Sequence, residues 1–132
     1  MSTQATANLE IKHWEEAPFH EIEGGPNLVR ASVTQAYRGD IEGEGRLEYL
    51  MIYQSDGVVP SMALERVVGR IGERSGSFVI RHTGSYAKNV ARSTFEVVPG
   101  TATGDLRGLR GTGSLHWPHE QPGTVTLDYD FA

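Results

Sequence analysis

The residues of this sequence that could do chemistry are polar side chains placed in phase with apolar ones. His82 alternates with Phe78, and Glu65 alternates with Val67, at the two-residue spacing that puts side chains on one face of a β-strand. An ionised carboxylate on a buried face is costly, so Glu65 must pair with a residue such as His82 or Arg81, or become neutral. Such residues form either a hydrogen-bonded structural cluster or a site that recognises a ligand.

Two tyrosines show the same pattern. Tyr49 and Tyr53 lie in phase with Leu47. We predict that Tyr49, Tyr53, Glu65 and His82 fringe an apolar cavity and are the candidate ligand-binding residues. The sequence assigns no catalytic residue.

The strand that carries Glu65 has two possible orientations. Glu65 shares one face with Ala63, while Arg66 shares the other face with Leu64 and Val68. Both faces contain apolar side chains, so alternation alone does not decide which of them points inward.

The sequence predicts no cofactor. It contains no cysteine, which excludes disulfides, thiolate nucleophiles and zinc–cysteine sites. The Gly-x-Ser-x-Gly nucleophile motif, the phosphate-binding glycine-rich loop and the dinucleotide-binding fingerprint are all missing. These absences lower the expectation of an enzyme without excluding one.

Two segments superficially resemble metal sites, and we expect neither to bind metal. Residues 40–45 begin like a calcium loop, but the twelfth position, which should be Glu, is Met51. Residues 116–120 contain two histidines and a glutamate. Positions three apart on a strand point to opposite faces, and Pro118 disrupts a helix, so this segment is interpreted as a solvated loop.

The charge balance argues against nucleic-acid and membrane partners. Twelve Lys and Arg residues are scattered among 17 Asp and Glu residues, for a net charge of -5, and no basic run could follow a phosphate backbone. No stretch approaches the roughly 18 to 20 apolar residues of a membrane span, and the N-terminal residues lack the pattern of a signal peptide. We therefore expect a cytoplasmic protein.

Runs of alternation between turn-forming clusters predict eight strands. They cover residues 7–16, 28–38, 44–54, 61–71, 77–86, 91–98, 113–117 and 124–131. Short connectors rich in Gly, Pro, Asn and Asp predict antiparallel neighbours. No window shows sustained 3.6-residue periodicity, so very little helix is expected. Residues 99–110 are the exception, with at most one helical turn at 105–107 capped by Thr103.

Eight sequential strands favour a closed antiparallel β-barrel, because closure removes the unpaired edges of a sheet. A β-sandwich is the competing architecture. Glycines inside the predicted strands favour the barrel, since they let strands coil or bulge at corners. They are Gly43, Gly45, Gly69, Gly84, Gly111 and Gly113. Residues 1–132 are predicted to form one domain, with residues 1–6 as a flexible N-terminus.

Two of the predicted strands contain a weak sequence repeat. Residues 43–49 and 111–117 both follow the pattern Gly-x-Gly-x-Leu-x-aromatic. The pattern indicates either two copies of one corner geometry or a coincidence in a glycine-rich chain.

Four segments together resemble the bacterial domain-of-unknown-function family 3224. They are LERV at 64–67, GSFVIRHTG at 76–84, VPGTATGDLRGLRGTG at 98–113 and LDYDF at 127–131, and the resemblance runs from about Ala7 to Phe131. It implies an allene-oxide-cyclase-like barrel and an oligomer, but no activity. Plant allene oxide cyclases on this barrel type bind a fatty epoxide in an apolar cavity, and dirigent proteins on a related barrel steer phenoxy radical coupling. None of their catalytic residues can be transferred to this chain.

Two hypotheses follow for function. The first is a barrel that binds a small apolar or amphipathic molecule, with a cofactor-independent isomerase or cyclase as its enzymatic form. The alternative is a non-catalytic structural or interaction module with a packed interior. A void able to hold about ten non-hydrogen atoms favours the first. Apolar residues on both strand faces, such as Met51 beside Ile52, also predict a homo-oligomer, most simply a dimer.

Overall fold

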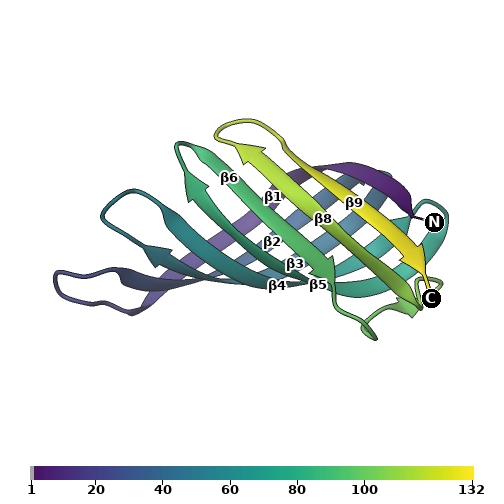
Figure 1. The fold of residues 1–132 in the computed structure, drawn as a ribbon, viewed down its shortest axis with the longest axis horizontal. Coiled ribbons are helices and arrows are strands. Elements are labelled where there is room, and N and C mark those ends of the chain that lie inside the picture. Colours follow the sequence, from purple (N-terminus) through teal and green to yellow (C-terminus); the bar gives the residue numbers. More distant parts are fainter. Residues whose placement is uncertain (1) are drawn as a thin grey trace.

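The computed structural model describes residues 2–132 and shows a closed antiparallel β-barrel (Figure 1). Its strands are β1 (Thr3–His20), β2 (Asn27–Gly39), β3 (Ile41–Tyr53), β4 (Val59–Ile71), β5 (Arg74–Ala87), β6 (Val90–Val97), β7 (Thr103–Gly104), β8 (Leu109–Pro118) and β9 (Gly123–Phe131). Eight strands form the ring β1-β2-β3-β4-β5-β6-β8-β9, closed by pairing of β9 with β1. The two-residue β7 pairs with β5 outside this ring. The predicted barrel is therefore confirmed and the sandwich is excluded.

The barrel has two different ends. At the hairpin end, on the left of Figure 1, four tight connections join β1 to β2, β3 to β4, β5 to β6 and β8 to β9. At the closed end lie both termini and the segment 98–108. The described residues contain no helix that is long and apolar enough to cross a membrane.

The segment 98–108 closes its end of the barrel with a buried leucine. Leu106 is 0% exposed and packs in the main hydrophobic core. The backbone nitrogen of Asp105 donates to the carbonyl of Ser75, which fixes the segment to β5. The segment stays within the expected limit of one helical turn, because its residues form turns and the short β7. The Thr103 hydroxyl lies 2.6 Å from that of Ser77, so it does not serve as a helix cap.

The first strand begins earlier than the alternation predicted. Residues Thr3 to Thr6 pair with β9, from Thr3 opposite Tyr129 to Thr6 opposite Thr126. These residues were expected to be flexible, so that boundary is corrected; Met1 lies outside the described residues. The strand pairing supplies backbone partners that alternation of side chains cannot reveal.

The glycines inside the strands let neighbouring backbones approach closely. Gly43 and Gly69 lie opposite each other, and a Cβ atom on Gly69 would come within 2.0 Å of the Glu42 carbonyl oxygen. The register shifts, however, lie in β1, between Ile11 and His13 and near its end, so bulging at the glycines is not observed. The glycines act through close approach and leave the register of β3 and β4 regular.

The two segments with the repeated pattern, residues 43–49 and 111–117, lie on opposite walls of the barrel. They lie in β3 and β8, and three strands of the ring separate these two on either side. In both, the leucine is buried, as Leu47 and Leu115. The aromatic residues that follow, Tyr49 and Trp117, border the same cavity from opposite sides. The repeated pattern therefore corresponds to a repeated wall geometry.

Candidate functional site

The Glu65 and His82 side chains meet inside the barrel. Glu65 is 0% exposed and His82 is 2% exposed. The Nε2 atom of His82 lies 2.7 Å from Oε1 of Glu65. The strand that carries Glu65 therefore turns its Ala63 and Val67 face inward, which settles the orientation that the sequence left open.

Two further side chains complete this cluster, and the sequence analysis missed them. Gln35 donates from Nε2 to Oε2 of Glu65 at 2.8 Å, and the Tyr37 hydroxyl donates to the same oxygen at 2.7 Å. Both are buried side chains of β2. They alternate with the buried Val33, so the signal that identified Glu65 could also have identified them. We call Gln35, Tyr37, Glu65 and His82 the polar cluster.

A glycine makes room for the carboxylate of the polar cluster. A Cβ atom on Gly45 would come within 1.9 Å of Oε2 of Glu65. On the other side, the His82 ring packs against Phe95 with ring centroids 5.3 Å apart, and the Phe95 ring lies in space that Gly113 leaves open. The cluster is therefore held by close packing as well as by hydrogen bonds.

One nitrogen of the cluster is left without a partner. The Nδ1 atom of His82 is buried and forms no hydrogen bond with any of the described residues. A buried N–H without an acceptor is costlier than an unpaired ring nitrogen that carries a lone pair. We therefore assign His82 as the tautomer with its proton on Nε2, which donates to Glu65, and with a bare Nδ1.

The arginines near Glu65 in the sequence do not pair with it. Arg81, one of the two partners considered, forms an ion pair with Glu96 on the outer face of the barrel. Arg66 donates from a guanidinium nitrogen to the Ser77 hydroxyl at 3.4 Å. Of the two expected partners, the structure therefore selects His82.

The charge of Glu65 acts on the tyrosines around it. Burial, and then the negative charge of Glu65, raise the pKa of Tyr37 well above its ordinary value. Burial and the same charge also raise the pKa of Tyr49. Both hydroxyls therefore stay protonated around neutral pH, and the Tyr37 hydroxyl serves as a hydrogen-bond donor to the carboxylate.

A cavity of about 590 Å³ lies inside the hairpin end of the barrel. Gln35 of the polar cluster borders it, and Tyr49 does so from β3. Its walls are mainly apolar, formed by Val33, Met51, Val59, Ala91, Leu115 and Trp117, with the hydroxyls of Ser61 and Ser93 among them. This volume falls within the roughly 300 to 1,000 Å³ typical of small-molecule sites.

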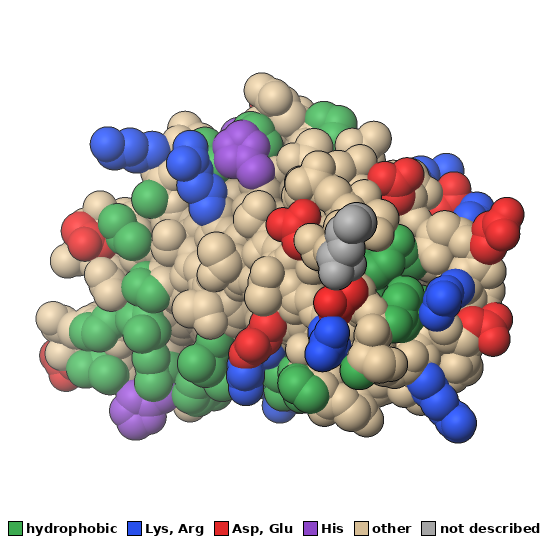
Figure 2. Space-filling view, turned by 45° about the vertical axis from the view of Figure 1, so that its right-hand side comes forward, with side chains coloured by type: hydrophobic (Ala, Val, Ile, Leu, Met, Phe, Trp, Pro, Cys, Tyr) green, Lys and Arg blue, Asp and Glu red, His purple; other side chains and the backbone are tan. Residues whose placement is uncertain are grey.

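The rim of the cavity carries exposed aromatic and aliphatic side chains. Ile11, Trp14 and Tyr53 all border the cavity and are about 40% exposed. The Tyr53 hydroxyl donates to Glu16, so Tyr53 lies at the mouth and away from the polar cluster. Figure 2 shows apolar side chains gathered at the lower left of one face, while acidic and basic side chains lie near one another on its right-hand side.

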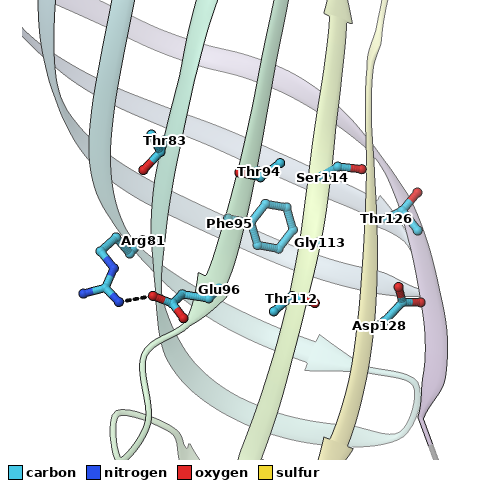
Figure 3. Close-up of a pocket in the computed structure, with 10 residues that line it drawn as sticks. All are labelled: Arg81, Thr83, Thr94, Phe95, Glu96, Thr112, Gly113, Ser114, Thr126 and Asp128. Carbon is cyan, nitrogen blue, oxygen red and sulfur yellow. Dashed lines mark hydrogen bonds and ion pairs between the residues drawn. The ribbon is translucent and has the colours of Figure 1, made fainter.

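A second depression lies on the outer face of β5, β6, β8 and β9 (Figure 3). Threonine and serine side chains border it, together with the Arg81–Glu96 ion pair. The Phe95 ring also borders it, next to Gly113. The depression is bordered by one sheet face only, whereas the interior cavity has walls from seven strands, β1 to β6 and β8. The interior cavity is therefore the better candidate for a binding site.

Neither segment that resembles a metal site gathers metal ligands. Among residues 2–132, no three His, Asp or Glu side chains are close enough together to hold an ion. His119 instead lies 3.6 Å from Glu120 in an exposed ion pair. Of the four candidate residues, the structure places Tyr49 on the cavity wall and Tyr53 at its mouth. Glu65 and His82 meet each other but do not border the cavity, which corrects the prediction for these two.

Comparison with known proteins gives a consistent result. The model of the family "Protein of unknown function (DUF3224)" matches residues 5–129. Among solved structures, the chain is similar to a protein of unknown function from the same family in Shewanella oneidensis MR-1, with 27% identity and a TM-score of 0.83. That similarity covers 100% of this chain and 99% of the other. No curated protein matches the chain.

Proposed function

The chain belongs to the DUF3224 family, which has no assigned activity, and from the geometry of its barrel we propose that it binds a small apolar or amphipathic molecule in the hairpin-end cavity. The observation that carries this proposal is the cavity itself, about 590 Å³ of space between mainly apolar walls. Its walls come from regular strands, so they are formed before a ligand arrives.

The cavity offers one polar region next to its apolar walls. Gln35 borders it from the polar cluster, and the Tyr49, Ser61 and Ser93 side chains add hydroxyl groups. A few polar groups among apolar walls orient a ligand that has one or two hydrogen-bonding atoms. If the ligand is reactive, the same walls can restrain its conformation and so favour one cyclisation or isomerisation without a cofactor.

Binding can be tested with the fluorescent probe N-phenyl-1-naphthylamine. Trp14 and Trp117 border the cavity, so a bound probe is expected to quench their emission in a saturable titration. Ser93→Phe fills the cavity and is expected to weaken binding by about tenfold or more. Thr94→Phe is the matched control, because Thr94 is the exposed neighbour on the outer face.

The outcomes of this titration are distinct. Unchanged affinity in the Thr94→Phe protein and loss of affinity in the Ser93→Phe protein support the proposal. Ser61→Leu, on another wall, replaces Ser93→Phe if that protein does not fold. Absence of saturable binding to the wild type, or equal affinity in the filled and control proteins, contradicts a ligand site in the barrel.

A second candidate function, an interaction module, is favoured by the outer face of β3 and β4. Leu50, Met62, Leu64 and Val68 are all about half exposed there, and Leu50 lies directly opposite Met62. We propose that this face takes part in a homodimer. Light scattering at tens of micromolar is expected to give a dimer for the wild type and a monomer for Leu64→Lys. A monomeric wild type contradicts the dimer.

A further inference from the structure

The polar cluster contains a carboxylate whose charge can be deduced from its hydrogen bonds. Gln35, Tyr37 and His82 all approach Glu65 at 2.7 to 2.8 Å, and each has a proton to donate. Three donors converging on two oxygens stabilise the ionised form of a carboxyl group. The arrangement therefore fits an ionised Glu65.

The unpartnered nitrogen of His82 fixes the charge of the pair. A neutral pair needs one more proton. That proton would lie either on Nδ1 of His82 or on Oε2 of Glu65, whose two lone pairs already accept from Gln35 and Tyr37. An N–H at Nδ1 would have no acceptor among the described residues, because Nδ1 is buried and unpaired. With Nδ1 bare, the pair formed by Glu65 and His82 carries one net negative charge.

This charge has no cation beside it. Within residues 2–132, no lysine or arginine nitrogen lies within ion-pair distance of Glu65, and the nearby Arg81 pairs with Glu96 outside the barrel. The three neutral donors spread the charge but do not cancel it. A charge in such a poorly solvated place acts over a longer range than one in water.

The negative charge reaches the cavity through the residues that the two share. Gln35 hydrogen-bonds to Glu65 and also borders the cavity. Tyr49 borders the cavity as well, and its pKa is raised by burial and by the charge of Glu65. A ligand beside Gln35 and Tyr49 therefore experiences the field of Glu65. Arg92 and Glu120 also border the cavity, but both are exposed, so water screens their charges more strongly.

Resting on the proposed binding function, we propose that the cavity selects its ligand by charge: it takes apolar molecules that are neutral or carry an amine, and excludes carboxylates of the same shape. Any ionic ligand loses hydration on entering an apolar cavity. For an amine, attraction to Glu65 offsets part of this loss, whereas for a carboxylate repulsion adds to it.

Three probes of one shape test this proposal. They are 1-naphthalenemethanol, 1-naphthylmethylamine and 1-naphthoate, each measured at pH 7 by displacement of N-phenyl-1-naphthylamine. All are compact enough to enter the cavity whole, so the polar group cannot remain outside. The uncharged alcohol shows whether the shape itself binds. The dissociation constant of the carboxylate divided by that of the amine then shows whether the cavity favours a positive or a negative ligand. In the wild type this ratio is expected to be about 10 or more.

Two variants test whether the charge of Glu65 causes this ratio of dissociation constants. Glu65→Gln keeps the size of the side chain and removes its charge, and it is expected to bring the ratio to about 3 or less. Glu96→Gln is the matched control, because Glu96 lies on the outer face in the ion pair with Arg81. The ratio in this control is expected to equal that of the wild type.

The results separate failure of this inference from failure of the proposed function. If the alcohol binds but the carboxylate binds as well as the amine, or if Glu65→Gln leaves the ratio unchanged, the charge selection is wrong while the binding site stands. If none of the probes binds, the binding site itself is wrong. Should Glu65→Gln not fold, Ser61→Lys adds a cation to the cavity wall and is expected to lower the ratio. A ratio that does not fall in that protein overturns the selection.

Discussion

The two ends of the barrel are built from the same alternating strands but differ in how their interiors are filled. At the closed end, Leu106 is inserted by the segment 98–108 and packs in the main core with Ile71, Phe78 and Leu109. At the hairpin end the connections are tight turns, and a cavity remains between the walls. Alternation thus decides which side chains point inward, while the presence of a plugging segment decides whether a barrel end is filled or hollow.

The polar cluster lies next to the hollow part of the barrel. Gln35 belongs both to this cluster and to the wall of the cavity. On the same strand, Tyr37 belongs to the main core. The buried charge therefore lies where a filled interior gives way to an open one, and a ligand at the hairpin end meets it there.

The largest expected effect compares one side chain from each end. Leu106→Ala removes a fully buried side chain from a filled region and is expected to lower the free energy of unfolding by about 2–5 kcal/mol. Met51→Ala removes a side chain that already borders the cavity, so its cost is expected at the low end of that range. Urea unfolding monitored by circular dichroism measures both.

This comparison has an internal control. Thr94→Ala, on the exposed outer face of β6, is expected to change stability by no more than about 0.5 kcal/mol. Equal losses for Leu106→Ala and Met51→Ala would show that the two ends are equally well packed, and the distinction between them would fail.

A double-mutant cycle tests the packing around Glu65, which lies where the filled end of the barrel meets the cavity. Gly45→Ala places a methyl group within 1.9 Å of Oε2 of Glu65 and is expected to cost about 1–3 kcal/mol. In the Glu65→Ala background the clash disappears, so the same substitution is expected to cost clearly less. Additive free energies, measured by urea unfolding of the four proteins, would mean that Gly45 does not serve to admit the carboxylate.

A pH effect is expected from Tyr37. Because its folded pKa is raised above the ordinary 10.0, folding favours the protonated phenol. Its contribution to stability is fully present below about pH 10 and is lost as the pH rises towards the folded pKa. The free energy of unfolding is therefore expected to fall more steeply above pH 10 in the wild type than in Tyr37→Phe. Identical slopes would contradict a raised pKa of Tyr37 in the folded protein, whether from burial or from the charge of Glu65.

The smallest expected effect is the position of one proton on His82, which NMR can detect in the wild type without any change in stability. Nitrogen-15 NMR of the wild type at pH 7 is expected to show His82 with a protonated Nε2 and an unprotonated Nδ1, because Nε2 has the acceptor. A protonated Nδ1 would show that the pair carries no net charge, and the basis for charge selection would be lost.

Much of the fold could be predicted from the sequence. Eight alternating runs gave the eight strands of the ring, and turn-forming residues gave their antiparallel order. The start of β1 was missed because residues 3–6 are identified as strand by pairing with β9, a partner distant in the chain. At most one helical turn was expected at residues 105–107, and Thr103 was expected to cap it; local turn signals do not reveal that the Thr103 hydroxyl has a partner in Ser77.

The candidate site was predicted in part. Alternation identified Glu65 and His82, and only the register of β4 against β5 brings them together, through Ala63 opposite His82. Gln35 carried the same signal but was not recognised. An apolar cavity was predicted, but its volume and its place at the hairpin end could not be, because they depend on which segment fills each end of the barrel.

The central claim, that the hairpin end holds a ligand site, is tested most directly by a crystal structure of the complex with N-phenyl-1-naphthylamine. We expect density for the probe inside the barrel, in contact with Met51 and Leu115 and beside Gln35. Density for the probe on the outer face of β3 and β4, or side chains filling the cavity and leaving no room for it, would contradict the claim.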